Sequence, residues 1–231
     1  MAAFPWVGLL VGSLAGAVLW GVAALGAGGL LGAALALAVV ALLTGALHLD
    51  GLADTADGLG SRKPAPEALS IMRKSDIGPM GVAALVLALL VDGAALSSLA
   101  ETGGAAAAGA LAVGAMLGRA VVTLTTVQTA SARQTGFGAL FVGSTARLTA
   151  VCTGAAVLVV SAGVGWLVNG VGGAAMVAGA AIAAGGIGRL WGAHVRRRLA
   201  GMTGDVFGSI VEVGQASFLV LAALGMAALQ P

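Results

Sequence analysis

The sequence is poor in the residues that cover the surface of a soluble protein. Only 9% of its 231 residues are charged, 4% are aromatic, and tyrosine is absent. Hydrophobic residues make up 59% of the chain, and the mean hydropathy is +1.06. A soluble domain of this length could not bury so much apolar surface. The composition therefore excludes a soluble globular protein and predicts an integral membrane protein.

Cysteine and N-terminal basic residues are also scarce. Cys152 is the single cysteine, so an intramolecular disulfide and a cysteine-rich zinc site are both excluded. No basic residue precedes the first apolar run, which argues against a cleaved signal peptide and favours a retained first helix.

Long apolar runs, by contrast, recur along the whole chain. A helix needs roughly 20 apolar residues to cross the hydrocarbon core of a bilayer. Seven runs of this kind are separated by short polar breaks: residues 4–25, 30–47, 79–99, 105–127, 148–168, 171–191 and 206–229. We therefore predict an all-α fold, a polytopic integral membrane bundle of about seven transmembrane helices. Residues 1–231 are expected to form a single transmembrane catalytic domain.

The positions of the charges predict the orientation of this bundle. All eleven Lys and Arg lie in or close to the loops that follow the second, fourth and sixth runs. The alternate loops have no basic residue, and Asp92 near one of them is expected to be a polar helix end. The positive-inside rule places the basic loops in the cytoplasm and both termini on the outer side. The net charge of +2 thus reflects topology and gives no support for nucleic-acid binding. The arginine run 196–198 is suited to binding anionic lipid headgroups.

The most informative polar segment is HLDGLADTADG, residues 48–58, which follows the second run directly. If the helix continues, Asp50, Asp54 and Asp57 share a sector of roughly 60° at positions i, i+4 and i+7. Such a stripe repels itself, and Mg²⁺ is commonly bound by a few carboxylates together with substrate phosphates. We predict that the three aspartates are magnesium ligands. The alternative is a solvated helix end, although negative charge is unfavourable at a helix C-terminus.

A second polar segment, RKPAPEALSIMRKSDIGPMG, leads into the third run. Pro79 with Gly78 and Gly81 leaves backbone N–H groups exposed at a helix start, which is suited to binding a phosphate. The alternative is an ordinary helix start with basic flanks. Four candidate substrate-binding residues precede it: Arg73, Lys74, Ser75 and Asp76.

Single polar residues elsewhere are further candidates. Arg119 and Glu212 fall inside apolar runs, where each is costly unless it faces a polar interior, so they pair with each other, face substrate, or do both. Asp205 begins the seventh run as an N-cap or a substrate contact, and the loop residue Arg133 could clamp a phosphate. His48 points away from the aspartates, and its role as metal ligand, general base or supporting residue is open.

Together these segments resemble the adenosylcobinamide-GDP ribazoletransferase family, also called cobalamin synthase, a membrane enzyme of the last steps of vitamin B12 assembly. Five segments in the same order carry the resemblance over nearly the whole chain. They are HLDGLADTADG (48–58), IMRKSDIGPMG (71–81), Gly118 with Arg119, ARQTGFG (132–138) and GDVFGSIVEVG (204–214).

The chain departs from the family pattern at a few positions. Many relatives read aspartate, serine, arginine where this chain has Lys74, Ser75 and Asp76, so acid and base have exchanged places. Relatives often carry a carboxylate where Gln215 stands, and two acids at 134–135, where this chain has glutamine and threonine.

The resemblance implies transfer of the adenosylcobinamide phosphate group from adenosylcobinamide-GDP to the ribose hydroxyl of α-ribazole or α-ribazole 5′-phosphate. GMP is released, and Mg²⁺ is required. In this scheme the three aspartates hold one or two Mg²⁺, and an aspartate or His48 accepts the ribose proton. It also implies a multi-pass protein of the cell inner membrane with its active site facing the cytoplasm. The residues that would hold phosphoryl oxygens are Arg73, Lys74, Arg119 and Arg133.

Two other classes of protein fit part of the pattern. Another membrane alcohol phosphotransferase or prenyltransferase would also bind a diphosphate through Mg²⁺ and aspartates. A transporter is less consistent with the sequence, because the acids gather at one membrane face and no inverted repeat of charged, broken helices is evident. The number of metal ions, the general base, the preferred lower-ligand base and the oligomeric state stay open, and a homo-oligomer is compatible with the sequence.

Overall fold

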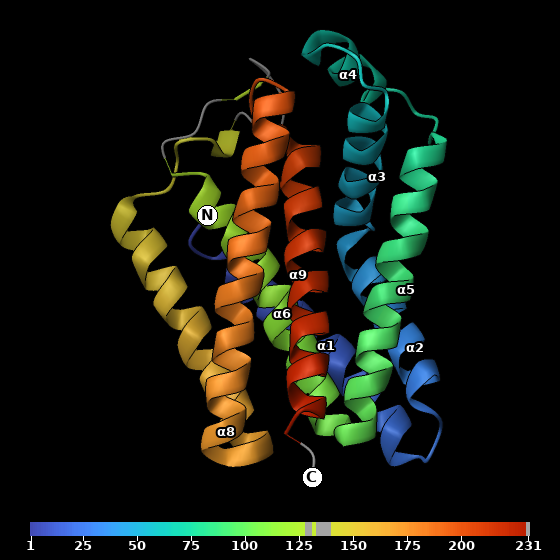
Figure 1. Cartoon of the computed structure of the whole chain (residues 1–231), viewed down its shortest axis with the longest axis vertical. Helices are drawn as coiled ribbons and strands as arrows, with labels where there is room; N and C mark the ends of the chain where they lie inside the picture. The colour runs from blue at the N-terminus through green and yellow to red at the C-terminus, as the bar shows by residue number, and fades with distance from the viewer. Residues whose placement is uncertain (128–130, 133–139, 230–231) are drawn as a thin grey trace.

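A computed structural model of the chain describes residues 1–127, 131–132 and 140–229. Nearly all of these residues are helical. Ser131 and Met202 form an isolated β-bridge. The helices in chain order are α1 (Phe4–Ala24), α2 (Gly29–Thr44), α3 (Leu47–Gly60), α4 (Ala65–Ile71), α5 (Pro79–Thr102), α6 (Gly104–Thr125), α8 (Arg147–Arg198) and α9 (Gly204–Ala227) (Figure 1).

The helices confirm a polytopic membrane bundle. Five of them, α1, α5, α6, α8 and α9, are long and apolar enough to cross a bilayer. The 52 residues of α8 are interrupted by non-helical backbone at Asn169 (φ −149°) and Gly170 (φ 54°), so residues 147–168 and 171–198 form two helices. With α2 and α3 counted as one broken span, the bundle has the seven crossings that the apolar runs predicted.

The sequence suggested that the aspartate helix continues the second apolar run. The structure shows instead that the aspartates lie on a separate helix, α3. Gly45 (φ 59°) and Ala46 (φ 55°) both adopt the left-handed conformation, which ends α2 at Thr44. A new helix begins at Leu47, and α2 and α3 meet at 90°. The break changes the direction of the chain by 90°, but Asp50, Asp54 and Asp57 still lie together on one helix.

Close backbone contact holds α3 against α9. Gly51 of α3 faces Gly208 of α9, and a Cβ on Gly51 would lie 2.6 Å from the Asp205 carbonyl oxygen. Small residues allow helices to approach this closely in a bilayer, where apolar burial does not drive association. The start of α9, including Asp205, is therefore positioned directly beside the aspartate helix.

The two termini lie at opposite ends of the bundle, which corrects the expectation that both are on the outer side. The Thr123 hydroxyl, close to the end of α6, donates to the Met1 carbonyl oxygen (3.4 Å). Helix α9 ends at the other end of the molecule, far from α4 (Figure 1). Seven is an odd number of crossings, so a chain with this topology begins and ends on different sides.

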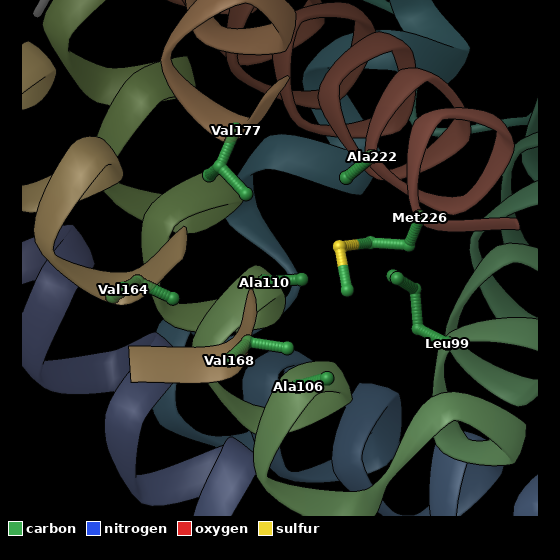
Figure 2. Close-up of a pocket in the computed structure, with 8 residues that line it drawn as sticks. All are labelled: Leu99, Ala106, Ala110, Val164, Val168, Val177, Ala222 and Met226. Carbon is green, nitrogen blue, oxygen red and sulfur yellow. The ribbon is translucent and has the colours of Figure 1, made fainter. Parts of the chain in front are cut away.

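The end of the bundle far from α4 is packed with apolar side chains. A cavity of about 10 Å³ lies there between α5, α6, α8 and α9, lined by residues such as Leu99, Val168 and Met226 (Figure 2). It is about the size of one water molecule and is lined by apolar residues alone, so it is unsuited to a polar ligand.

Adding a methyl group at Gly51 is expected to push α3 away from α9. Gly51→Ala should lower the free energy of unfolding by about 1–3 kcal/mol, the usual cost of overpacking against backbone. Thermal unfolding of the detergent-purified protein, followed by tryptophan fluorescence, measures this. Gly163→Ala is the matched control, because a Cβ there meets nothing within 4 Å. An unchanged midpoint for Gly51→Ala would contradict this account of the contact.

Candidate active site

Helix α3 presents its three aspartates with increasing burial along its length. Asp50 is exposed, whereas Asp54 and Asp57 are half-buried. The helix is flanked by α9 through Gly51 and by α5 through Asp57. The acids thus lie on the part of α3 between these two neighbours, near the end of the bundle that carries α4 (Figure 1).

Asp57 binds the N-terminus of α5. The backbone N–H groups of Gly78 and Gly81 donate to the two carboxylate oxygens of Asp57, at 2.7 and 2.8 Å. These amides belong to the first turn of α5, where they have no partner within the helix. The anion at this helix start is therefore a side chain of the protein itself, and binding of a substrate phosphate by Gly78 and Gly81 stays a prediction.

The fit of the aspartates to magnesium follows from their spacing. Asp50 and Asp57 are about 10 Å apart along the helix axis, given 1.5 Å per residue. Among residues 1–127, 131–132 and 140–229, no three His, Cys, Asp or Glu side chains are grouped closely enough to hold a metal ion. Mg²⁺ is usually bound by one or two carboxylates plus substrate phosphates. Asp50 and Asp54, one turn apart, suit that mode of binding.

A cavity lined by both charged and apolar residues adjoins Asp57. Its volume is about 360 Å³, within the range of small-molecule pockets. It brings together Asp57, Lys74, Asp76 and Gly78, four of the residues singled out in the sequence. The other lining residues are Gly60, Ser61, Ile71, Pro79 and Met80. One basic and two acidic residues therefore line the cavity where α3 ends and α5 begins.

The remaining candidates near this end lie outside the cavity. Arg73 and Ser75 are exposed and are not among its lining residues, and Arg133 lies outside the described residues. Asp205 lies beside Gly51 but is not the N-cap of α9. Thr203 has that role, since its hydroxyl oxygen accepts from the Val206 N–H (3.2 Å) and its hydroxyl group donates to Asp205 (3.3 Å).

Three candidates lie inside the bundle rather than at the aspartate surface. His48 is buried, with its ring centroid 6.2 Å from that of Phe4. The Arg119 guanidinium lies 5.8 Å from the same Phe4 ring and donates to the Ala115 carbonyl oxygen (2.9 Å). Glu212 is buried and interacts electrostatically with Arg119, but in the described part of the chain the two are not within the 4.0 Å of an ion pair.

Sequence reasoning missed one polar contact in the interior. Asp92 is 2% exposed and lies in the middle of α5, where it accepts a hydrogen bond from the Gln215 side chain of α9 (3.1 Å). It is therefore not a polar helix end. The signal was present, because an acid within an apolar run must find a partner in the interior of a membrane bundle.

Fold and site define a polytopic helical membrane protein with a charged pocket at one end of its bundle. A family model described as Cobalamin-5-phosphate synthase matches residues 1–223. The chain therefore belongs to the cobalamin-5-phosphate synthase family.

Curated relatives agree with this family. Proteins named adenosylcobinamide-GDP ribazoletransferase from Shigella dysenteriae serotype 1 (strain Sd197), Escherichia coli (strain K12) and Shigella flexneri are each 35% identical to it over 218 residues. Each alignment covers 94% of this chain and 84% of the relative. No solved structure matches the chain.

Removing the Asp57 carboxylate is expected to release the start of α5. Asp57→Ala should lower the free energy of unfolding by about 1–3 kcal/mol, because two backbone N–H groups lose their acceptor. Asp57→Asn should cost less, since its amide oxygen can keep one of the two bonds. Thermal unfolding measures both variants against Asp50→Asn, an exposed acid whose loss should change stability by no more than about 0.5 kcal/mol. Equal stability of Asp57→Ala and Asp50→Asn would contradict the capping role.

Proposed function

We propose that this protein transfers the adenosylcobinamide phosphate group from adenosylcobinamide-GDP to the ribose hydroxyl of α-ribazole or α-ribazole 5′-phosphate, releasing GMP. The name of the relatives, adenosylcobinamide-GDP ribazoletransferase, supports these two substrates. The observation that carries the proposal is the aspartate helix α3 ending at a cavity of about 360 Å³ that also contains Lys74 and Asp76.

The reaction replaces a phosphoanhydride bond at the corrinoid phosphate with a phosphodiester link to the ribose. The ribose hydroxyl oxygen forms a bond to that phosphorus, the bond from phosphorus to the oxygen bridging to GMP breaks, and the hydroxyl proton passes to a base. Lys74 is suited to hold phosphoryl oxygens, because it is the basic residue among those that line the cavity. An aspartate at this surface is the better-placed base, since His48 is buried against Phe4.

We propose Mg²⁺ as the cofactor, held by Asp50 and Asp54 with substrate oxygens. When bound, it would neutralise the negative charge of the diphosphate and of the departing GMP. Asp57 would support the site indirectly, by fixing the start of α5 that forms one wall of the cavity. The chain's own carboxylates thus divide between holding a cation and shaping the pocket.

We also propose that the pocket faces the cytoplasm of a cell with the protein in its inner membrane. The apolar outer faces of helices such as α1, α5 and α8 carry many exposed large side chains, including Leu10, Leu90 and Leu167, which suit lipid contact. The loops at the pocket end carry the basic residues, which the positive-inside rule retains in the cytoplasm.

Loss of one carboxylate charge should stop turnover without removing a membrane span. We expect Asp54→Asn to lower the rate of GMP release by about 100-fold or more, the scale typical of a lost electrostatic contact to the transition state. The assay uses detergent-purified protein with adenosylcobinamide-GDP, α-ribazole and a titration of Mg²⁺. Glu101→Gln, an exposed acid in the last turn of α5, is the control and should retain activity. Near-normal turnover by Asp54→Asn would remove Asp54 from the proposed mechanism, and no turnover by well-folded wild-type protein would refute the function.

Orientation can be measured with single cysteines in a Cys152→Ser background. A membrane-impermeant maleimide should label Glu101→Cys in intact spheroplasts, whereas Ser70→Cys on α4 should react only after permeabilisation. Both residues are exposed, so access to the reagent depends on the side of the membrane. The reverse labelling pattern would place the pocket on the outer side.

A further inference from the structure

A second charged pocket lies on the far side of α9 from the aspartate helix. Its volume is about 150 Å³, and Arg189, Gly192, Ala193 and Arg196 of α8 line it together with Thr125 and Met202. Helix α9 separates it from α3, which is packed on the opposite side of α9 (Figure 1).

Contacts of individual residues locate α9 between the two pockets. Ile210 of α9 lies against Gly192, because a Cβ on Gly192 would be 2.8 Å from its Cδ1. Gly208, two residues earlier, lies against Gly51 of α3. A helix with its side chains is about 10 Å thick, so the second pocket is a separate site.

The spacing of the α8 residues explains why a hollow forms. Arg189, Gly192, Ala193 and Arg196 are at positions i, i+3, i+4 and i+7, which places them on one face of the helix. The two small residues leave space between two long basic side chains. Both arginines are exposed. Neither forms an ion pair within 4.0 Å among the described residues, where Lys63 and Glu67 form such a pair.

The surroundings favour a ligand at the membrane surface. The indole N–H of Trp191 donates to the Ser209 hydroxyl (3.0 Å), and its ring stacks on His194. Tryptophan with basic residues at a helix end is typical of the headgroup region of a bilayer. Two guanidinium groups that form no ion pair with a carboxylate among the described residues suit phosphate oxygens, which they bind through several parallel N–H donors.

We propose that the pocket between Arg189 and Arg196 binds a phosphate group, from an anionic lipid headgroup or from free phosphate. The site does not depend on the proposed transferase activity. Arg197 and Arg198 share the last turn of α8 but do not line the pocket, so they provide a charge-matched control.

Native mass spectrometry of the detergent-purified full chain, with phosphatidylglycerol or inorganic phosphate as the added probe, tests the site. Arg189→Gln with Arg196→Gln should weaken binding of at least one probe about tenfold, as expected for lost charge-assisted hydrogen bonds. The Arg197→Gln, Arg198→Gln double variant should stay within about twofold of wild type, because equal charge is removed outside the pocket. Binding of phosphatidylglycerol alone identifies a lipid site, and binding of inorganic phosphate identifies a soluble phosphate site.

A steric variant separates the pocket from general surface charge. Ala193→Leu keeps both arginines but fills the hollow, and it should weaken binding of the same probe as strongly as the double arginine variant. Unchanged thermal unfolding of each variant shows that the fold is retained. Equal losses in the two double variants, wild-type binding by Ala193→Leu, or no binding of either probe would overturn the proposal.

Discussion

The contact on which the site depends is the pair of hydrogen bonds from the Gly78 and Gly81 amides to Asp57. A helix start leaves backbone donors without partners, and a membrane-embedded bundle has little water to satisfy them. By placing a carboxylate there, the chain joins α3 to α5 at the edge of the cavity. The same bonds compensate the charge of Asp57, which gives this acid a structural role at the start of α5.

The break at Gly45 and Ala46 sets the direction in which α3 runs. A helix continued straight from α2 would carry the acids along the α2 axis, whereas the 90° bend turns α3 into the space between α5 and α9. Gly51 then allows α3 to lie against the backbone of α9 at Asp205. The same short helix therefore packs against α9 through Gly51 and contributes Asp57 to the lining of the pocket.

The sequence predicts the bundle well because apolar runs of membrane length have few alternative structures. It also predicts that the three aspartates share a helix, since i, i+4 and i+7 is a local relation. It could not predict that Asp57 binds α5, because that contact joins residues 21 and 24 positions apart. The left-handed Ala46 was harder to predict, since alanine is a strong helix former, although Gly45 beside it is a typical residue at the end of a helix.

The interior polar residues show how the chain accommodates charge away from the pocket. Gln215 donates to Asp92, so a neutral amide stands at a position where the resemblance noted in the sequence suggested a carboxylate. Two acids at this distance in a buried environment would repel each other, and an amide donor removes that repulsion. The departure from the family pattern is thus consistent with the local partner of Gln215 in this chain.

The exchange of acid and base in the loop before α5 has a similar explanation. Lys74 and Asp76 both line the cavity, whereas Ser75 between them does not. In this chain, lysine, serine and aspartate at positions 74–76 thus contribute one basic and one acidic residue to the pocket. Because both residues line one pocket, exchanging their order along the chain leaves one acidic and one basic residue at that pocket.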